Sequence, residues 1–179
     1  MPPSTSPNCR FAISTPSYNL LLEELTKMIL YHGSQQIVRQ PEIRSGKYTK
    51  DFSTGFYCTI LKEQAIRWAT RFPTTGYVNI FSCKLIDDLQ IKRFETMTEE
   101  WLDFIVACRH GETHDYDLVD GPMANDTIFN YVQDFIDGTI SREAFWALAK
   151  FKRPTHQICF HTQKALDTLT FEGYEIHGN

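Results

Sequence analysis

An apolar run that begins at Met28 ends in Tyr31-His32-Gly33-Ser34. This change from apolar to polar residues is typical of a buried strand that ends at a binding cleft. Two later stretches read as strands that carry one polar or aromatic side chain among apolar neighbours: Gly55-Phe56-Tyr57-Cys58-Thr59 and Gln157-Ile158-Cys159-Phe160. A histidine beside a glycine, a phenol and a side-chain amide can converge when three strands meet. The three stretches therefore predict one small cleft.

Strand alternation separates a core face from a cleft face in the two later stretches. Tyr57 points to the opposite side from Phe56 and Cys58, so one side of that strand can be core and the other cleft. Gln157 alternates in the same way with Ile158. Taken singly, each polar side chain is explained as well by packing, and only their combination favours a site.

The residues after His32 also suit a ligand. Gly33 lacks a Cβ, so a ligand can approach its backbone, and Ser34 adds a hydroxyl. A lone histidine after an apolar strand is more often a hydrogen-bonded structural residue, and these two neighbours are what distinguish His32.

Composition sets the outer bounds. The chain has 179 residues, of which 42% are hydrophobic and 22% charged, and this fits one domain with a sizeable core. Residues 1–27 are expected to form a flexible lead-in with a short helix, because the first 18 are rich in Pro, Ser and Thr. Residues 28–179 form the domain. The net charge of −4 excludes a broad basic field, although a local basic groove stays open.

Cysteine usage and the chain's hydropathy predict a cytoplasmic protein. The five cysteines are odd in number, widely spread and without a CxxC pair, which indicates reduced and mostly buried thiols. No run of 18 apolar residues is present, and the N-terminus lacks the order of a secretion signal. We expect no contact with a membrane.

Periodicity places helices and strands in an irregular alternation. Further strands are expected over 77–85, 89–94, 116–121, 156–161 and 170–176. Helices are expected over 61–72 and 163–169. Three more are expected to begin at a Thr96-Glu99 capping box, after residues 123–126 and after Ser141. Residues on their apolar, inward-facing stripes include Phe72, Phe104, Phe129 and Leu148, and Trp68 is expected to be a packing or rim residue. Without βαβ regularity, the class predicted is α+β with mainly antiparallel strands.

Several familiar chemistries are excluded. GxGxxG, GxxxxGK[ST] and HExxH are all absent. His110 and His114 have a spacing that could ligate zinc, but no third ligand is evident, so no metal is expected. Asp115 and Asp117 could mimic the carboxylate pair of a glycosidase, but two charges at the start of a strand are usually solvated, so we expect a structural role for both.

A set of ordered motifs resembles the DUF3990 family, a group of small bacterial proteins with the ADP-ribosyltransferase fold. The motifs are Leu30-Tyr31-His32-Gly33-Ser34, the stretch 51–59 with Gln64-Ala65 and Trp68-Ala69, the stretch 116–126, and 156–160 with Lys164-Ala165-Leu166. The resemblance covers about residues 28–171. It implies split antiparallel β-sheets with surrounding helices and NAD+ in the cleft between the sheets.

The resemblance also implies roles for four residues. His32 would bind the adenosine ribose, the Gly33 backbone the nicotinamide carboxamide, and Tyr57 would stack on the nicotinamide ring, where a cation-π contact contributes about 0.5 to 2 kcal/mol. Gln157 stands where the best-known transferases have a glutamate. An amide supplies a dipole and a hydrogen bond but no negative charge to stabilise a developing cation.

Further polar residues are candidates for contact with NAD+. They are Ser34, Arg39, Lys50, Asp51, Asn125 and Asp126. Arg39 and Lys50 could meet the pyrophosphate, since both cations complement phosphate oxygens. Helix capping explains at least one of Asn125 and Asp126 without any ligand.

The function predicted is a mono-ADP-ribosyltransferase that uses NAD+ to modify a macromolecule, protein or nucleic acid. The resemblance favours a bacterial toxin or phage-defence effector, with an antitoxin or immunity protein as a further partner. Two alternatives stay open: an NAD+ glycohydrolase, with water as acceptor, and a non-catalytic NAD+ or ADP-ribose binding module.

Overall fold

The computed structural model describes residues 27–44, 50–124, 126–149 and 155–178. The predicted lead-in, apart from Lys27, lies outside these residues. Within them the strands are β1 (Met28–Ser34), β2 (Phe56–Cys58), β3 (Gly76–Cys83), β4 (Ile91–Arg93), β5 (Leu118–Gly121), β6 (Gln157–Phe160) and β7 (Leu169–His177). The helices are α2 (Lys62–Ala69), α3 (Glu99–Arg109), α4 (Asp126–Ile136), α5 (Arg142–Leu148) and α6 (Gln163–Leu166).

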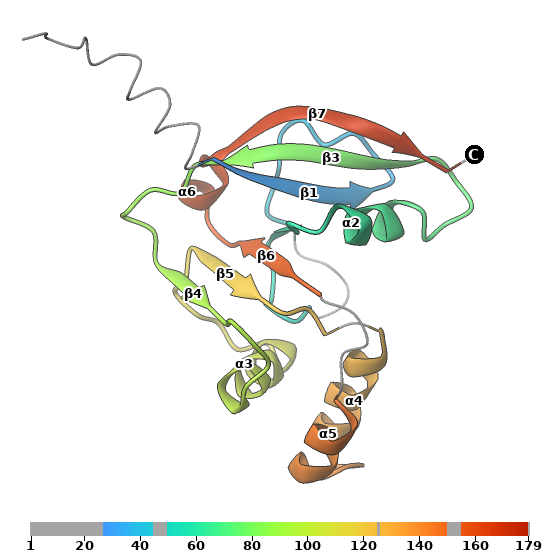
Figure 1. Cartoon of the computed structure of the whole chain (residues 1–179). Helices are drawn as coiled ribbons and strands as arrows, with labels where there is room; N and C mark the ends of the chain where they lie inside the picture. The colour runs from blue at the N-terminus through green and yellow to red at the C-terminus, as the bar shows by residue number, and fades with distance from the viewer. Residues whose placement is uncertain (1–26, 45–49, 125, 150–154, 179) are drawn as a thin grey trace, which may run out of the picture.

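The strands form two sheets (Figure 1). Sheet A has three strands in the order β1-β3-β7, and sheet B has four in the order β2-β6-β5-β4. All neighbouring strands are antiparallel except β4 and β5. The α+β class with mainly antiparallel strands is confirmed.

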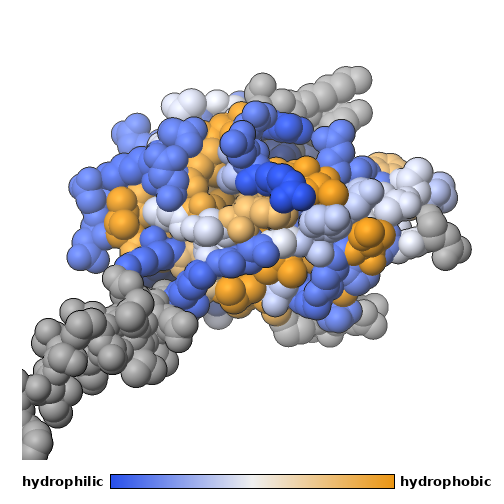
Figure 2. Space-filling view, turned by 90° about the horizontal axis from the view of Figure 1, so that it is seen from above, coloured by the Kyte–Doolittle hydropathy of each residue, from blue (hydrophilic) through white to orange (hydrophobic). Residues whose placement is uncertain are grey.

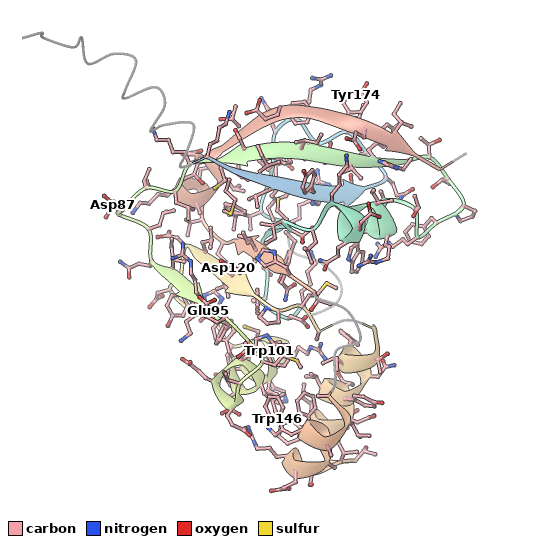
Figure 3. All side chains as sticks on the ribbon, in the orientation of Figure 1. Asp87, Glu95, Trp101, Asp120, Trp146 and Tyr174 are labelled. Atoms are coloured by element: carbon pink, nitrogen blue, oxygen red, sulfur yellow. The ribbon has the colours of Figure 1, made fainter. Side chains whose placement is uncertain are left out.

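The layers stack in a simple order. In Figure 1, sheet A lies above sheet B, α2 lies under sheet A, and α3, α4 and α5 form a lower layer. Figure 3 shows Trp101 and Trp146 in this helical layer, and Asp120 on sheet B above it.

Figure 2 views the molecule from above, where hydrophobic residues form patches among hydrophilic ones. Two exposed residues of β7, Tyr174 and Ile176, are 39% and 61% exposed.

The two sheets touch at one point and then separate. Tyr31 of β1 and Thr59, just after β2, exchange two backbone hydrogen bonds, with N–O distances of 2.8 and 2.9 Å. Beyond Tyr31, β1 continues through His32 to Ser34 and pairs with β3 alone among the strands of sheet A. The end of β1 therefore forms one wall of a gap between the sheets.

Helix α2 packs against sheet A through backbone contacts that only glycine allows. A Cβ on Gly33 would lie 2.0 Å from the Ala65 carbonyl oxygen, and one on Gly76 would lie 2.0 Å from that of Ala69. Ala65 and Ala69 are themselves fully buried. The small residues on both sides bring the helix close to the strands.

This close packing corrects the expectation for the larger residues of the helix. Phe72 was predicted to face inward, yet it is 49% exposed, and Trp68, expected to be a packing or rim residue, is 41% exposed. The helix ends at Ala69, before the predicted stop at Phe72, and Thr70 is its C-cap. Alanine, not tryptophan, occupies the face against the sheet because the backbones are too close for a large side chain.

Two clusters of apolar residues form the core. One lies between the sheets and contains Leu30, Phe56, Phe81, Leu118, Ile158, Phe160 and Leu166. The other joins sheet B to the helical layer and contains Phe52, Trp101, Leu102, Ile105, Val119, Ile128, Val132 and Phe145. The four cysteines that the structure describes, at positions 58, 83, 108 and 159, are free and buried, as predicted.

Helix caps and faces differ in part from the sequence prediction. Helix α3 begins two residues later than the predicted capping box, because the Thr98 hydroxyl accepts the hydrogen bond from the Trp101 N–H. The predicted Ser141 cap of α5 is confirmed, since its hydroxyl accepts from the Ala144 N–H. Phe129 and Leu148 were predicted to be inside but are 40% and 45% exposed.

The structural role expected for Asp117 is confirmed, although the residue is not solvated. It is 9% exposed. Its carboxylate accepts hydrogen bonds from the Gln90 N–H at 2.9 Å and the Thr162 hydroxyl at 2.6 Å. These bonds tie β5 to the loop before β4 and to the start of α6, so Asp117 is structural. Asp115 is exposed, as predicted.

Candidate functional site

A cavity of about 570 Å³ opens where the two sheets separate. Its lining comes from the end of β1, the segment 50–51, β2 with Thr59, α2 with Arg71, the residues 123–124, Phe129 of α4 and Gln157. Seven predicted site residues meet there: His32, Gly33, Ser34, Lys50, Asp51, Tyr57 and Gln157. The predicted cleft between three strands is confirmed.

The backbone of Gly33 forms an open hydrogen-bonding edge on this cavity. Tyr31 directs its N–H and C=O toward Thr59, and alternate residues of a strand direct these groups to the same edge. Gly33 therefore presents both groups at the edge where sheet A, as far as the structure describes it, has no further strand. A donor and an acceptor lie side by side there, as a primary carboxamide requires.

The missing side chain of Gly33 has a different purpose from the predicted one. We expected it to admit a ligand, but its space is filled by the Ala65 carbonyl of α2. The cavity-facing feature of this glycine is its backbone edge, whereas its lack of a Cβ serves the packing of α2.

His32 presents a fixed acceptor nitrogen. Its Nδ1 lies 2.7 Å from the carbonyl oxygen of Tyr57, and because a carbonyl only accepts, Nδ1 carries the proton. The ring stacks on Phe56 with 4.5 Å between centroids. Burial lowers the pKa of His32, so the imidazole is neutral at pH 7 and its Nε2 is an acceptor.

Tyr57 presents a ring face and not a reactive hydroxyl. The hydroxyl donates to the Ser53 carbonyl at 2.6 Å and accepts from the Phe52 N–H at 3.2 Å. Burial raises the pKa of this phenol far above its usual value, so it does not transfer protons near neutral pH. The Lys50 ammonium lies 4.6 Å from the ring centroid, so the exposed π face already holds a cation.

Gln157 is held by a buried ion pair. Its Nε2 donates to Asp51 Oδ2 at 3.3 Å, while Asp51 Oδ1 lies 2.6 Å from Arg109 Nη2. The Ala124 N–H donates to Asp51 Oδ2 at 2.9 Å. An amide oxygen would be repelled by the carboxylate, so Asp51 fixes which end of the Gln157 amide faces it. Oε1 is left without a hydrogen-bond donor among the described residues.

This geometry changes the role predicted for Asp51. The sequence suggested contact with NAD+, but its carboxylate is 6% exposed and its oxygens are taken up by Arg109, Ala124 and Gln157. Asp51 positions the side chain that lines the cavity, and Arg109 balances its charge.

Other predicted residues lie elsewhere. Arg39 is exposed and its guanidinium stacks on Phe171 at 5.3 Å, outside the cavity lining. The Ser34 hydroxyl lines the cavity but donates to the Gln36 carbonyl at 2.5 Å. Asn125 lies outside the described residues, and Asp126 is the first residue of α4.

Gln64 is a site residue that the sequence analysis did not single out. Its Nε2 donates to the His156 carbonyl at 2.6 Å and its Oε1 accepts from the His156 N–H at 3.1 Å. This pair of bonds fastens α2 to the segment before Gln157. The sequence feature that could have identified Gln64 is a side-chain amide beside Ala65 on the apolar side of a predicted helix. The other lining residues missed were Tyr31, Gln35, Cys58, Thr59, Ala65, Arg71, Met123, Ala124 and Phe129.

Fold and site together define a two-sheet α+β protein with a ligand-sized cavity where the sheets part. The chain belongs to the DUF3990 family, described as "protein of unknown function", whose model matches residues 28–171. No curated protein matches the chain. In the described part of the chain, no helix is both long and apolar enough to span a membrane. The same residues contain no cluster of three or more His, Cys, Asp or Glu side chains suited to a metal ion.

Proposed function

We propose that the protein is an NAD+-dependent mono-ADP-ribosyltransferase. The observation that carries this proposal is the pairing of the open Gly33 backbone edge with the Tyr57 ring face in one cavity. A carboxamide on a cationic aromatic ring is the group that such a pair complements, and nicotinamide in NAD+ is that group.

The proposed seat for NAD+ uses groups with free bonding capacity. The carboxamide pairs with the N–H and C=O of Gly33, and the pyridinium stacks on Tyr57 after the Lys50 ammonium has moved away. The Nε2 of His32 accepts a hydrogen bond from a ribose hydroxyl. Lys50 also lines the cavity and can meet the pyrophosphate, whereas Arg39 lies outside the lining.

The reaction breaks one bond and forms one. The C1′–N bond of the nicotinamide ribose breaks, and its electron pair goes to the pyridinium, which leaves as neutral nicotinamide. C1′ passes through an oxocarbenium-like state and bonds to a nucleophile of the acceptor, which gives up its proton to solvent. The products are ADP-ribosylated acceptor, nicotinamide and a proton.

In this proposal Gln157 binds and orients the reacting ribose. Its Oε1, kept away from Asp51, accepts a hydrogen bond from a hydroxyl of the ribose and directs a carbonyl dipole at the developing cation. A dipole stabilises a cation less than a full charge does, so we expect slower chemistry than a glutamate would support.

The test is nicotinamide release from NAD+, followed by mass spectrometry, with cell lysate as a source of acceptors. Tyr57→Ala should slow release between about twofold and thirtyfold, the loss of a cation-π contact of about 0.5 to 2 kcal/mol. Tyr174→Ala is the matched control, because Tyr174 is a half-exposed tyrosine on β7 and is absent from the cavity lining. NAD+ that binds without releasing nicotinamide would refute the transferase. Release without a labelled macromolecule would identify a glycohydrolase.

The cellular part of the proposal is a toxin or defence effector acting on the cell's own macromolecules, and the family resemblance supports it. Induced expression should arrest growth, and Tyr57→Ala should relieve the arrest while Tyr174→Ala does not. Equal toxicity of both variants would count against an enzymatic origin of the effect.

A further inference from the structure

An exposed stack of aromatic and cationic side chains lies at the edge of the cavity. Arg71 Cζ is 4.8 Å from the centroids of both the Trp68 and the Phe72 rings. Both rings are largely exposed, and Trp68 and Arg71 line the cavity. We call Arg67, Trp68, Arg71 and Phe72 the rim patch.

The rim patch carries positive charge that forms no ion pair in the described part of the chain. Arg67 and Arg71 are exposed, and neither has a carboxylate within ion-pair distance among the described residues. Burial, and to a smaller extent the charge of Arg71, lowers the pKa of Lys50, so these two cations share the cavity mouth. The charge at the mouth is thus opposite to the chain's net charge of −4.

Exposed rings interleaved with unpaired cations suit a single-stranded nucleic acid. Bases stack on aromatic faces and on guanidinium planes, and the cations bind the phosphates. A duplex hides its base faces, so it could not use the rings. An acidic peptide could use the charges but would leave the two exposed rings without a matching partner.

We propose that the rim patch docks a single-stranded nucleic acid, and that this strand is the acceptor of the ADP-ribosyl group. The second half rests on the proposed function, because it assumes transfer from NAD+ in the cavity. Docking brings a base of the strand to the mouth that Trp68 and Arg71 share with the NAD+ seat.

The test measures docking without NAD+. Fluorescence anisotropy of a 5′-labelled single-stranded 12-mer, as RNA and as DNA, is recorded against the same sequence as a duplex and against a labelled oligoglutamate peptide. Trp68→Ala should weaken single-strand binding about tenfold, the loss of one base stack. Arg71→Gln should lower the slope of log affinity against log salt by about 0.7, the loss of one phosphate contact.

Matched variants control for nonspecific effects. Tyr174→Ala removes a half-exposed ring from β7, and Arg93→Ala removes a cation from β4; neither residue lines the cavity. Both should leave single-strand binding unchanged. Phe72→Ala is a second test of the patch, since its ring is 49% exposed and its loss spares the helix packing.

Three results would overturn the docking proposal. The first is that duplex or oligoglutamate binds as tightly as the single strand. The second is that the control variants lose as much strand binding as the rim-patch variants. The third is that Trp68→Ala weakens NAD+ binding but not strand binding, which would make the ring an adenine subsite. Nicotinamide release from NAD+ alone is scored separately. Strand binding without release would uphold the docking half and refute the transferase. Release with labelled protein and unlabelled strand would uphold the transferase and refute the strand as its acceptor.

Discussion

Replacing Gln157 with glutamate tests whether the amide is required by its surroundings. The Nε2 of Gln157 lies 3.3 Å from Asp51 Oδ2, so Gln157→Glu brings two carboxylate oxygens to that separation. At an effective dielectric constant of 20, unit charges at this distance repel by about 5 kcal/mol. Arg109 is already paired with Asp51 and offsets part of this repulsion. We therefore expect the new carboxyl to stay protonated at neutral pH.

The sign of the pH dependence follows from linkage. The pKa of the new carboxyl is raised above its unfolded value of about 4.3, so the folded state holds a proton that the unfolded state has lost. The stability of the variant relative to wild type is then greatest below about pH 4.3 and falls as the pH rises. Between pH 5 and pH 8 the loss should be about 2 to 4 kcal/mol in the free energy of unfolding.

Urea unfolding at pH 5 and pH 8 measures this loss. The matched control is Gln163→Glu, because the Gln163 Nε2 also donates to an aspartate, Asp167, at 2.7 Å, but at the exposed start of α6. Solvent screens the charges there, so this control should change by less than about 1 kcal/mol between the two pH values. If Gln157→Glu is as insensitive to pH as the control, Asp51 does not dictate the amide and the reasoning is refuted.

Three further outcomes are expected. Gly33→Ala should lower the free energy of unfolding by about 1 to 3 kcal/mol or more in chemical denaturation, because its Cβ would lie 2.0 Å from the Ala65 carbonyl; a neutral result would mean that α2 packs more loosely. Tyr57→Phe should keep nicotinamide release within a few-fold of wild type. Its free energy of unfolding should fall by about 1 kcal/mol, because the hydrogen bond to the Ser53 carbonyl is lost. An inactive Phe variant would instead assign a chemical role to the hydroxyl. Burial lowers the pKa of His161 to about 4, so stability should fall by about 3 kcal/mol as the pH drops from 6.5 to 4, and a thermal-melt series on His161→Gln should show a smaller fall.

Strand alternation and composition predicted much of the fold. The features that they could not predict depend on contacts between segments far apart in the chain. The apolar periodicity of β1, β2 and β6 predicted three strands that meet at one cleft, because alternation depends only on local sequence. The N-cap of α3 was displaced from Thr96 to Thr98, since both threonines offer the same hydroxyl and only the path of the chain decides between them. Whether Trp68 packs inside or lies at the rim stayed open, because periodicity does not show how closely a helix approaches a sheet.

The site shows why a residue's role cannot be carried over without its neighbours. Gln157 looks like a weakened glutamate when the sequence is read alone, yet in the fold it faces Asp51 and only a donor fits there. Asp51 in turn is held by Arg109, which comes from a helix 58 residues further along the chain, so no local pattern could have linked the three. If an amide donor is what Asp51 requires, the double variant Asp51→Asn with Gln157→Glu should be less pH-sensitive than Gln157→Glu alone. The neutral asparagine would remove the like-charge repulsion, and Arg109 would still supply a positive charge to the network.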